Sequence, residues 1–305
     1  MPSPTENSRR YLDPKVLDKL GRLELKARQA VEGFMAGLHR SPQRGASVEF
    51  AEHREYVPGD DLRHLDWRIY GRSDRFYIKR YEEETNLTLS VLLDVSESMA
   101  YAGEGQVSKF RYGAMVAATL AYMVLRHRDA AAVALTDDSL EGWVPPATRP
   151  SHLLAITDQI EKAKLAAKTD PGLLLREMAA KLPPRSIVAV VSDLFADPDR
   201  ILSGLRALKA KRQDVIVFHV LDRDEIEFPF DKMTRFEGLE GFDPLVADPK
   251  ALRKAYLEVF GAHREKLRKG CLRNGVDYQL LPTDTPLDVA LTSYLSLRAK
   301  RGARR

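Results

Sequence analysis

Residues 90–100 read SVLLDVSESMA. A short apolar run at 91–93 leads directly into Asp94, and serines follow at positions 96 and 98. An apolar run without alternation is typical of a strand buried on both faces of a sheet. Alternate residues of extended chain point the same way, so the oxygens of Asp94, Ser96 and Ser98 can converge. The stretch therefore predicts a buried strand that ends in three oxygen-bearing side chains.

The same strand-like pattern recurs along the chain from residue 87 onward. Strands are predicted at 87–94, 131–136, 187–192, 215–221 and 277–281, with a weaker edge strand at 140–144. Helices are predicted between and after them, at 109–127, 152–163, 172–181, 198–211, 249–270 and 286–298. Alternation of apolar strands with helices predicts an α/β fold with a doubly wound, mostly parallel sheet.

The first part of the chain has a different pattern. Residues 1–86 are expected to form a helical and charged N-terminal extension that packs on a core domain of residues 87–305. Within the extension we expect a helix at 13–40, a loop-like segment at 41–60 that is rich in proline and glycine, and a short strand at 75–81. Residues 222–246 interrupt the later alternation and predict an inserted hairpin or loop.

The composition excludes several classes of protein. With 305 residues, of which 44% are hydrophobic and 30% charged, the chain can bury a sizeable core. The net charge of +4 is too mild to indicate nucleic-acid binding. A single cysteine, Cys271, rules out an intrachain disulfide and fits a reducing compartment. No membrane span and no signal peptide are predicted, so the expected location is cytoplasmic.

A second acid extends the pattern of the opening stretch. Asp193 directly follows the predicted strand 187–192, in the run VAVVSDLFAD. Ligands of open parallel sheets bind beyond the carboxyl ends of the strands, and magnesium prefers oxygen ligands. Two acids at neighbouring strand ends, with Ser96 and Ser98 beside them, would form such a site. The alternative is that these residues only cap helices and form turns, as aspartate and serine often do after a strand.

The order Asp94-Val-Ser96-Glu-Ser98 resembles the Asp-x-Ser-x-Ser signature of von Willebrand factor type A domains, and Asp193 resembles their later aspartate. The resemblance implies a doubly wound α/β fold with a metal-ion-dependent adhesion site. It implies that Ser96 and Ser98 contact Mg²⁺, with Mn²⁺ or Ca²⁺ as alternatives, while Asp94 and Asp193 act directly or through water.

That family pattern also includes a threonine on a loop between the two acids. The nearest candidates are Thr148 and Ser151, in the run PPATRPSH. Neither lies in the usual glycine-rich context, so the resemblance implies a site that is incomplete or weakly occupied.

The charged segment before residue 87 resembles a bacterial family known only as domain of unknown function fifty-eight. The matching residues there are Glu49, Phe50, Arg54, Glu55, Tyr56, Pro58, Gly59, Asp60, Asp61, Arg63, Asp66, Trp67, Arg72 and 82–84, and further matches lie at 247–249, Tyr256 and 281–286. In that family the segment precedes a von Willebrand type A-like domain. Its genes often neighbour those of MoxR-type AAA+ ATPases, which implies such an ATPase as a partner.

The charged segment has two readings. Arginine–carboxylate pairs could pin it as a structural network, with Trp67 as an apolar anchor. It could instead be an exposed interaction surface, because tryptophan and arginine dominate interface hot spots. A nucleic-acid groove is disfavoured, since its acids would repel phosphate. The residues assigned to partner binding or structure are Arg54, Asp60, Asp61, Arg63, Asp66, Trp67 and Arg72.

Catalytic signatures are missing from the sequence. There is no nucleotide-binding P-loop, no Gly-x-Ser-x-Gly elbow and no His-Glu-x-x-His run. We therefore expect no enzyme but a metal-dependent protein–protein interaction module. The family resemblance implies that this module is a partner or adaptor of a MoxR-type ATPase in a chaperone-like or assembly role. The alternatives are a magnesium-dependent phosphohydrolase that uses Asp94 and a scaffold with a degenerate metal site.

Overall fold

The computed structural model describes residues 48–57, 66–73, 75–83, 87–136, 142–165, 171–237 and 244–302. The chain divides into two compact units, one of residues Phe34–Asn86 and a larger one that contains Leu87–Arg305. The assignment of residues 1–86 as an extension that packs on the core stays a prediction. The helix predicted at 13–40 lies outside the described residues.

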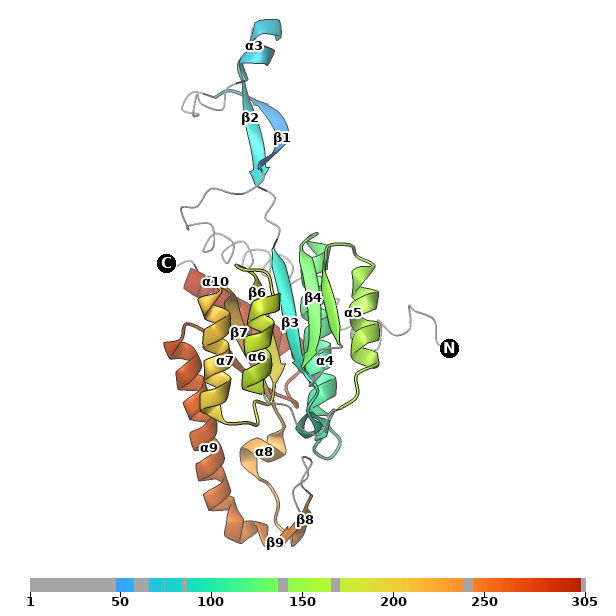
Figure 1. Ribbon diagram of the computed structural model, residues 1–305, viewed down its shortest axis with the longest axis vertical. Helices are drawn as coiled ribbons and strands as arrows, with labels where there is room; N and C mark the ends of the chain where they lie inside the picture. The colour runs from blue at the N-terminus through green and yellow to red at the C-terminus, as the bar shows by residue number, and fades with distance from the viewer. Residues whose placement is uncertain are drawn as a thin grey trace. The chain divides into compact units, whose positions relative to one another are not determined.

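Within its described residues, the larger unit is built on a six-stranded sheet of order β10-β7-β6-β3-β4-β5 (Figure 1). All neighbouring strands are parallel except β4 and β5, which are antiparallel. The strands are β3 (Thr88–Asp94), β4 (Ala130–Thr136), β5 (Trp143–Ala147), β6 (Ile187–Ser192), β7 (Asp214–Leu221) and β10 (Asp277–Pro282). The predicted α/β class with a mostly parallel sheet is confirmed.

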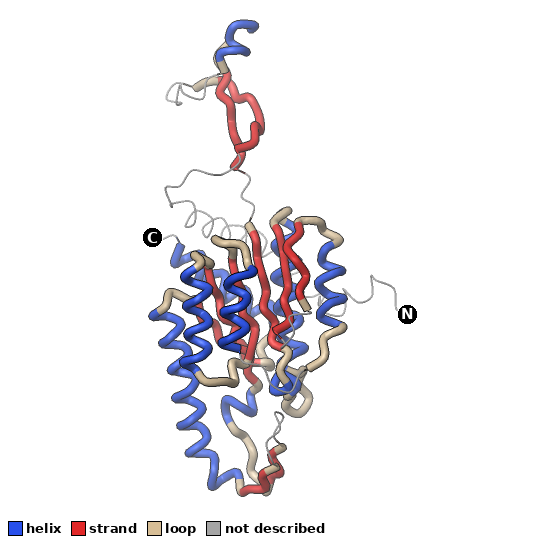
Figure 2. The backbone as a smooth tube through the Cα atoms, viewed as in Figure 1, coloured by secondary structure: helices blue, strands red, loops and turns tan. Residues whose placement is uncertain are grey.

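Helices cover both faces of this sheet (Figure 2). On one face α4 contacts α5, and on the other α6 contacts α7, which contacts α9. The ring of Phe218 in β7 meets that of Tyr294 in α10 edge-on, at a centroid distance of 5.2 Å. The helices are α4 (Lys109–Arg126), α5 (His152–Glu161), α6 (Pro171–Lys181), α7 (Pro198–Ala210), α9 (Pro249–Arg273) and α10 (Leu287–Gly302).

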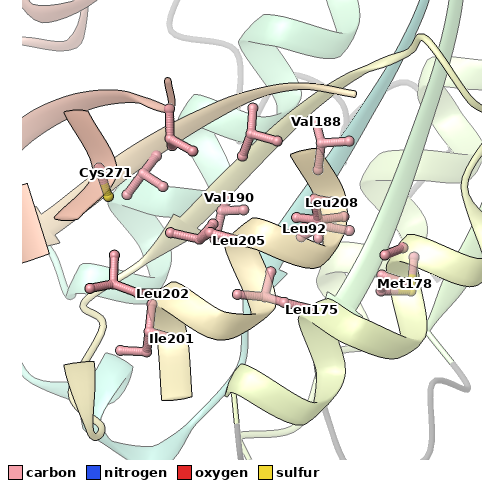
Figure 3. Close-up of a cluster of buried hydrophobic side chains, with 14 of the residues drawn as sticks. Leu92, Leu175, Met178, Val188, Val190, Ile201, Leu202, Leu205, Leu208 and Cys271 are labelled. Carbon is pink, nitrogen blue, oxygen red and sulfur yellow. The ribbon is translucent and has the colours of Figure 1, made fainter. Parts of the chain in front are cut away.

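One hydrophobic core lies between the sheet and the α6, α7 and α9 layer (Figure 3). Every residue of β6 is buried, which explains why this strand shows no alternation of apolar and polar residues. Cys271 belongs to this core and is fully buried, as expected for a structural thiol. Its fully buried aliphatic members include Leu92, Val188, Leu205, Leu208, Val215, Val217 and Leu267.

Helices α6 and α7 approach closely at two glycines. A Cβ on Gly204 would lie 2.6 Å from the Cβ of Leu175 and 2.8 Å from the carbonyl oxygen of Gly172. We therefore expect Gly204→Ala to destabilise the fold by about 1–3 kcal/mol, as other overpacking changes do. The control is Gly261→Ala in α9, where nothing lies within 4 Å, and which should stabilise by about 1 kcal/mol through helix propensity. Urea unfolding of both variants measures the difference, and equal stabilities would contradict the close packing.

The sequence predicts an inserted hairpin or loop at residues 222–246. Their described residues form α8 (Arg223–Glu227) and the strand β8 (Thr234–Phe236), which pairs antiparallel with β9 (Leu245–Ala247). Figure 1 shows these elements beyond the strand ends of the large sheet, beside the first turns of α9. The ring of Tyr256 in α9 packs tilted against that of Phe228, with centroids 4.5 Å apart, and its hydroxyl donates a hydrogen bond to the carbonyl of Glu225. No described helix has the length and apolarity needed to cross a membrane.

The smaller unit contains an antiparallel hairpin of β1 (Val48–Glu55) and β2 (Tyr77–Glu83), with α3 (Trp67–Ser73) between them in the chain. The prediction of a loop over 41–60 is wrong for 48–55, because cross-strand pairing with β2 stabilises a strand whose own sequence is largely charged. The rings of Tyr70 and Phe76 stack at 4.4 Å.

Candidate metal centre

The strand order places a switch point between β3 and β6. From β3 the chain proceeds to β4 on one side of the sheet, and β6 begins the strands on the other side. In sheets of this kind the loops diverge at the switch point and leave a crevice beyond the carboxyl ends of the strands. Leu93 of β3 pairs with Val191 of β6. Asp94 and Asp193 therefore follow adjacent strand ends at this point.

The Asp94 loop brings its three oxygen-bearing side chains together. Asp94, Ser96 and Ser98 are all buried, with exposed fractions of 5%, 6% and 8%. The backbone N–H of Ser96 donates to Asp94 Oδ1 at 2.9 Å, and the hydroxyls of Ser96 and Ser98 lie 3.0 Å apart. The short helix that begins at Glu97 follows directly and holds this turn.

The charge on Asp94 is not favoured by its surroundings. Burial and the neighbouring charge of Asp193 raise the pKa of Asp94 to about 6, although hydrogen bonds from Ser192 and Ser96 oppose the shift. The Ser192 hydroxyl donates to Asp94 Oδ2 at 2.5 Å and accepts from the N–H of Leu194 at 2.8 Å. Sequence reasoning missed Ser192, whose only signal was its place immediately before Asp193.

Asp193 is paired with a buried lysine that sequence reasoning also missed. Lys109, the first residue of α4, is 1% exposed, and its ammonium donates to Asp193 Oδ2 at 2.7 Å and to Glu225 Oε1 at 2.6 Å. Burial raises the pKa of Asp193, but the charge and hydrogen bond of Lys109, with help from the Ser98 hydroxyl, outweigh it and lower the pKa. Asp193 Oδ1 accepts the N–H of Phe195 at 3.2 Å.

His219 supports the backbone of Asp193. Its Nε2 lies 2.7 Å from the Asp193 carbonyl oxygen, and its Nδ1 lies 2.6 Å from the hydroxyl of Tyr278. Burial lowers the pKa of His219 to about 4, so the ring is neutral at physiological pH. The histidine is a satisfied core residue that positions the strand end.

Further hydrogen bonds link the loop after Ser98 to residues that follow β7 and β10. Asp222, which follows β7 and is fully buried, accepts from the N–H of Gly103 and the hydroxyl of Thr283, each at 3.0 Å. A Cβ on Gly103 would lie 2.8 Å from Asp222 Oδ1, so a larger residue there would require this carboxylate to shift. The Tyr101 hydroxyl donates to Asp224 Oδ2 at 2.9 Å. The loop after Ser98 is thereby fixed to α8 and to the end of β10.

The prediction of Thr148 and Ser151 as metal ligands is wrong. Both follow β5, which runs antiparallel to β4, and the last residue of β5, Ala147, pairs with Ala131 near the start of β4. Asp94 instead pairs with Thr136 at the end of β4. Ala131 and Thr136 are five residues, or about 16 Å, apart along β4. Thr148 and Ser151 therefore lie near the edge of the sheet opposite the one that holds Asp94.

The charged segment is described in part. Asp66 is buried, and its carboxylate accepts the N–H of Ile69 at 3.4 Å, which is a structural role at the start of α3. Trp67 is 66% exposed and meets Tyr70 only edge-on, so it is no buried anchor. Arg54 lies in β1 and Arg72 in α3. The remaining predicted residues lie outside the described residues, namely Asp60, Asp61 and Arg63.

The chain is thus an α/β protein with a mostly parallel sheet and a cluster of buried acids, serines and one lysine at its switch point. Residues 52–266 match the model of the family described as "Protein of unknown function DUF58". The chain belongs to the DUF58 family, which confirms the resemblance seen in the charged segment. Uncharacterized proteins of Mycobacterium bovis and Mycobacterium tuberculosis are 24% identical over 296 residues, with 95% of this chain and 92% of each relative covered.

Two solved structures are similar to part of the chain. The conserved hypothetical protein BatB from Bacteroides thetaiotaomicron is 14% identical with a TM-score of 0.45, covering 72% of this chain and all of that one. An aerotolerance-related membrane protein from Bacteroides fragilis is 14% identical with a TM-score of 0.44, covering 70% and 99%.

Proposed function

We propose that this chain is a protein-binding module of the von Willebrand type A kind, in which a divalent cation held at the switch point is completed by an acidic side chain of a partner. The observation that carries the proposal is the convergence of Asp94, Ser96 and Ser98 beside Asp193 at adjoining strand ends. No bond is made or broken in this function. The cytoplasmic location stays a prediction.

The residues fit a hard divalent cation. Their side chains offer carboxylate and hydroxyl oxygens, which Mg²⁺ prefers, and Mg²⁺ keeps water in its remaining positions. Ser96 and Ser98 would hold the cation directly, while Asp94 and Asp193 would act directly or through water. A cation would offset the burial and the repulsion from Asp193 that together raise the pKa of Asp94. No group of three histidine, cysteine or acidic residues suited to a metal occurs in the described part of the chain.

One observation favours a second candidate, a scaffold whose metal site is degenerate. The ammonium of Lys109 already supplies a positive charge to Asp193, at 2.7 Å. A phosphohydrolase has less support, because Asp94 is 5% exposed and its two oxygens already accept hydrogen bonds from Ser96 and Ser192.

The partner that we propose is a MoxR-type AAA+ ATPase, in a chaperone-like or assembly role, on the strength of the family resemblance. An exposed apolar side chain beside the metal centre is our candidate for contact with this ATPase. Leu194 adopts a left-handed backbone conformation with φ of 52° and is buried, while the next residue, Phe195, is 57% exposed. Such strained backbone concentrates at functional sites, and aromatic side chains are frequent at interface hot spots.

A titration with Mg²⁺ tests the metal centre. Isothermal calorimetry of the wild-type chain should detect one site, and Ser98→Ala should weaken it by about tenfold through loss of an oxygen ligand. The matched control is Ser90→Ala in β3, the strand that precedes this loop, where the buried hydroxyl has no hydrogen-bond partner among the described residues. That variant should bind Mg²⁺ as the wild type does. The absence of a wild-type response, or equal affinities for both serine variants, would favour the scaffold.

A further inference from the structure

Lys109 is a long, charged side chain that is almost completely enclosed, with 1% of its surface exposed. Lysines are almost never fully buried unless they are paired. Its ammonium has two acidic partners, Asp193 after β6 and Glu225 in α8. Burial lowers the pKa of Lys109, but the charges of Asp193 and Glu225 raise it by more, so the ammonium stays charged.

The lysine shares Asp193 with the proposed metal centre. The Asp193 carboxylate accepts a hydrogen bond from the Lys109 ammonium at 2.7 Å and another from the Ser98 hydroxyl. Ser98 is one of the proposed metal ligands. A divalent cation beside Ser98 and Asp193 would therefore have a fixed positive charge as a close neighbour. Two positive charges repel strongly in a buried setting, where little water screens them.

Glu225 acts on the same ammonium from the other side. Its Oε1 accepts from Lys109 at 2.6 Å, and its Oε2 accepts the N–H of Asp222 at 2.8 Å, which fixes the glutamate in the capping box of α8. Glu225 thus offsets part of the positive charge that Lys109 presents to Asp193.

We propose that Lys109 sets the affinity of the metal centre: it is a tethered cation that weakens divalent-cation binding at Asp193, and Glu225 moderates this effect. The inference rests on the proposed metal centre and names the residues that tune it. Removal of the ammonium leaves Asp193 with its full negative charge for the metal. Removal of the Glu225 charge leaves Lys109 to act on Asp193 alone.

The test uses Mg²⁺ titrations of the full chain, together with melting temperatures in EDTA and in Mg²⁺. Lys109→Met should melt lower than the wild type in EDTA, because two buried acids lose their partner. Its Mg²⁺ affinity should rise by about tenfold, and Mg²⁺ should raise its melting temperature by more than that of the wild type. Glu225→Gln should shift the Mg²⁺ affinity in the opposite direction. Lys109→Arg, which keeps the charge, should stay close to the wild type.

The opposite signs separate this role from a merely structural one, which would weaken Mg²⁺ binding in both Lys109→Met and Glu225→Gln. If Lys109→Met does not fold in either buffer, Glu225→Gln decides: unchanged or tighter Mg²⁺ binding overturns the inference. A wild type that binds Mg²⁺ through Ser98, with weaker binding in Lys109→Met, overturns the inference and leaves the proposed function intact. Binding that appears only in Lys109→Met supports the inference and overturns the proposed function. No binding in any variant overturns both.

Discussion

Asp94→Asn is expected to lower the affinity of the chain for Mg²⁺ by about a hundredfold, because it removes a charge at the centre of the site. The amide is nearly isosteric and its oxygen can still accept the N–H of Ser96, so the fold should be retained. Relief of the repulsion with Asp193 should even raise stability when no metal is present. Calorimetric titration measures the affinity and thermal unfolding checks the fold; near-normal binding by a folded variant would contradict the metal centre.

The same variant separates binding from catalysis. ATPases need Mg²⁺ for their own nucleotide, so chelation is an ambiguous treatment. Binding of the proposed partner, a purified MoxR-type ATPase, should therefore be compared between variants at constant Mg²⁺. Asp94→Asn should lose the partner and Phe195→Ala should weaken it, while Leu272→Ala, an exposed apolar change at the far end of α9, should not. Hydrolysis of a phosphate ester that Asp94→Asn abolishes would instead support the phosphohydrolase.

The pH dependence of Mg²⁺ binding follows from the raised pKa of Asp94. With that pKa at about 6, the carboxylate is ionised above pH 6 and protonated below it. Protons and the cation compete for the ionised form, so the affinity should be level near pH 8 and fall as pH decreases through 6. The fall approaches about tenfold per pH unit when one proton is displaced. Residual binding by Asp94→Asn should lack this step.

Phe218→Ala should have the largest effect on the fold. The ring lies in the centre of β7, is fully buried and meets Tyr294 of α10 edge-on. Truncation of such a buried phenylalanine costs about 3–5 kcal/mol, because it removes apolar burial and leaves a cavity. For a unit of this size the melting temperature should fall by roughly 10 °C.

The control for this change is Phe195→Ala, since Phe195 is 57% exposed. Exposed substitutions usually change stability by less than about 0.5 kcal/mol. Differential scanning calorimetry of both variants compares two phenylalanines that differ in burial. A loss of stability in Phe195→Ala similar to that in Phe218→Ala would show that Phe195 packs against the fold and is not displayed to a partner.

The buried strands could be predicted because their sequence is sufficient to define them. Runs such as 187–192 are apolar on both faces of the strand. This pattern is typical of a strand that is covered by helices on both sides of the sheet. The direction of β5 could not be predicted, because it depends on pairing with β4 and not on the local sequence. Because β5 runs antiparallel to β4, Thr148 and Ser151 lie at the edge of the sheet opposite Asp94.

The burial of Lys109 beside the metal centre could not be predicted for a related reason. A lysine in the first turn of a helix is ordinarily solvated. It can be buried here only because two acids, 84 and 116 residues away in the chain, meet it at the sheet edge. Ser96 and Ser98 were accessible to sequence reasoning because they follow Asp94 on one short loop. Their partners arise from tertiary structure.

The hydrogen bonds that Asp222 accepts from Gly103 and Thr283 have a consequence for biosynthesis. The loop that contains Gly103 emerges from the ribosome first, but its hydrogen-bond acceptor Asp222 is translated 119 residues later, and Thr283, which donates to Asp222, follows 180 residues after Gly103. Contacts so distant in sequence form late in folding. A nascent fragment that ends before β10 therefore has the signature residues without the finished site. A cation bound at the proposed metal centre would add its stabilisation by mass action to a site whose surrounding hydrogen bonds are completed late in synthesis.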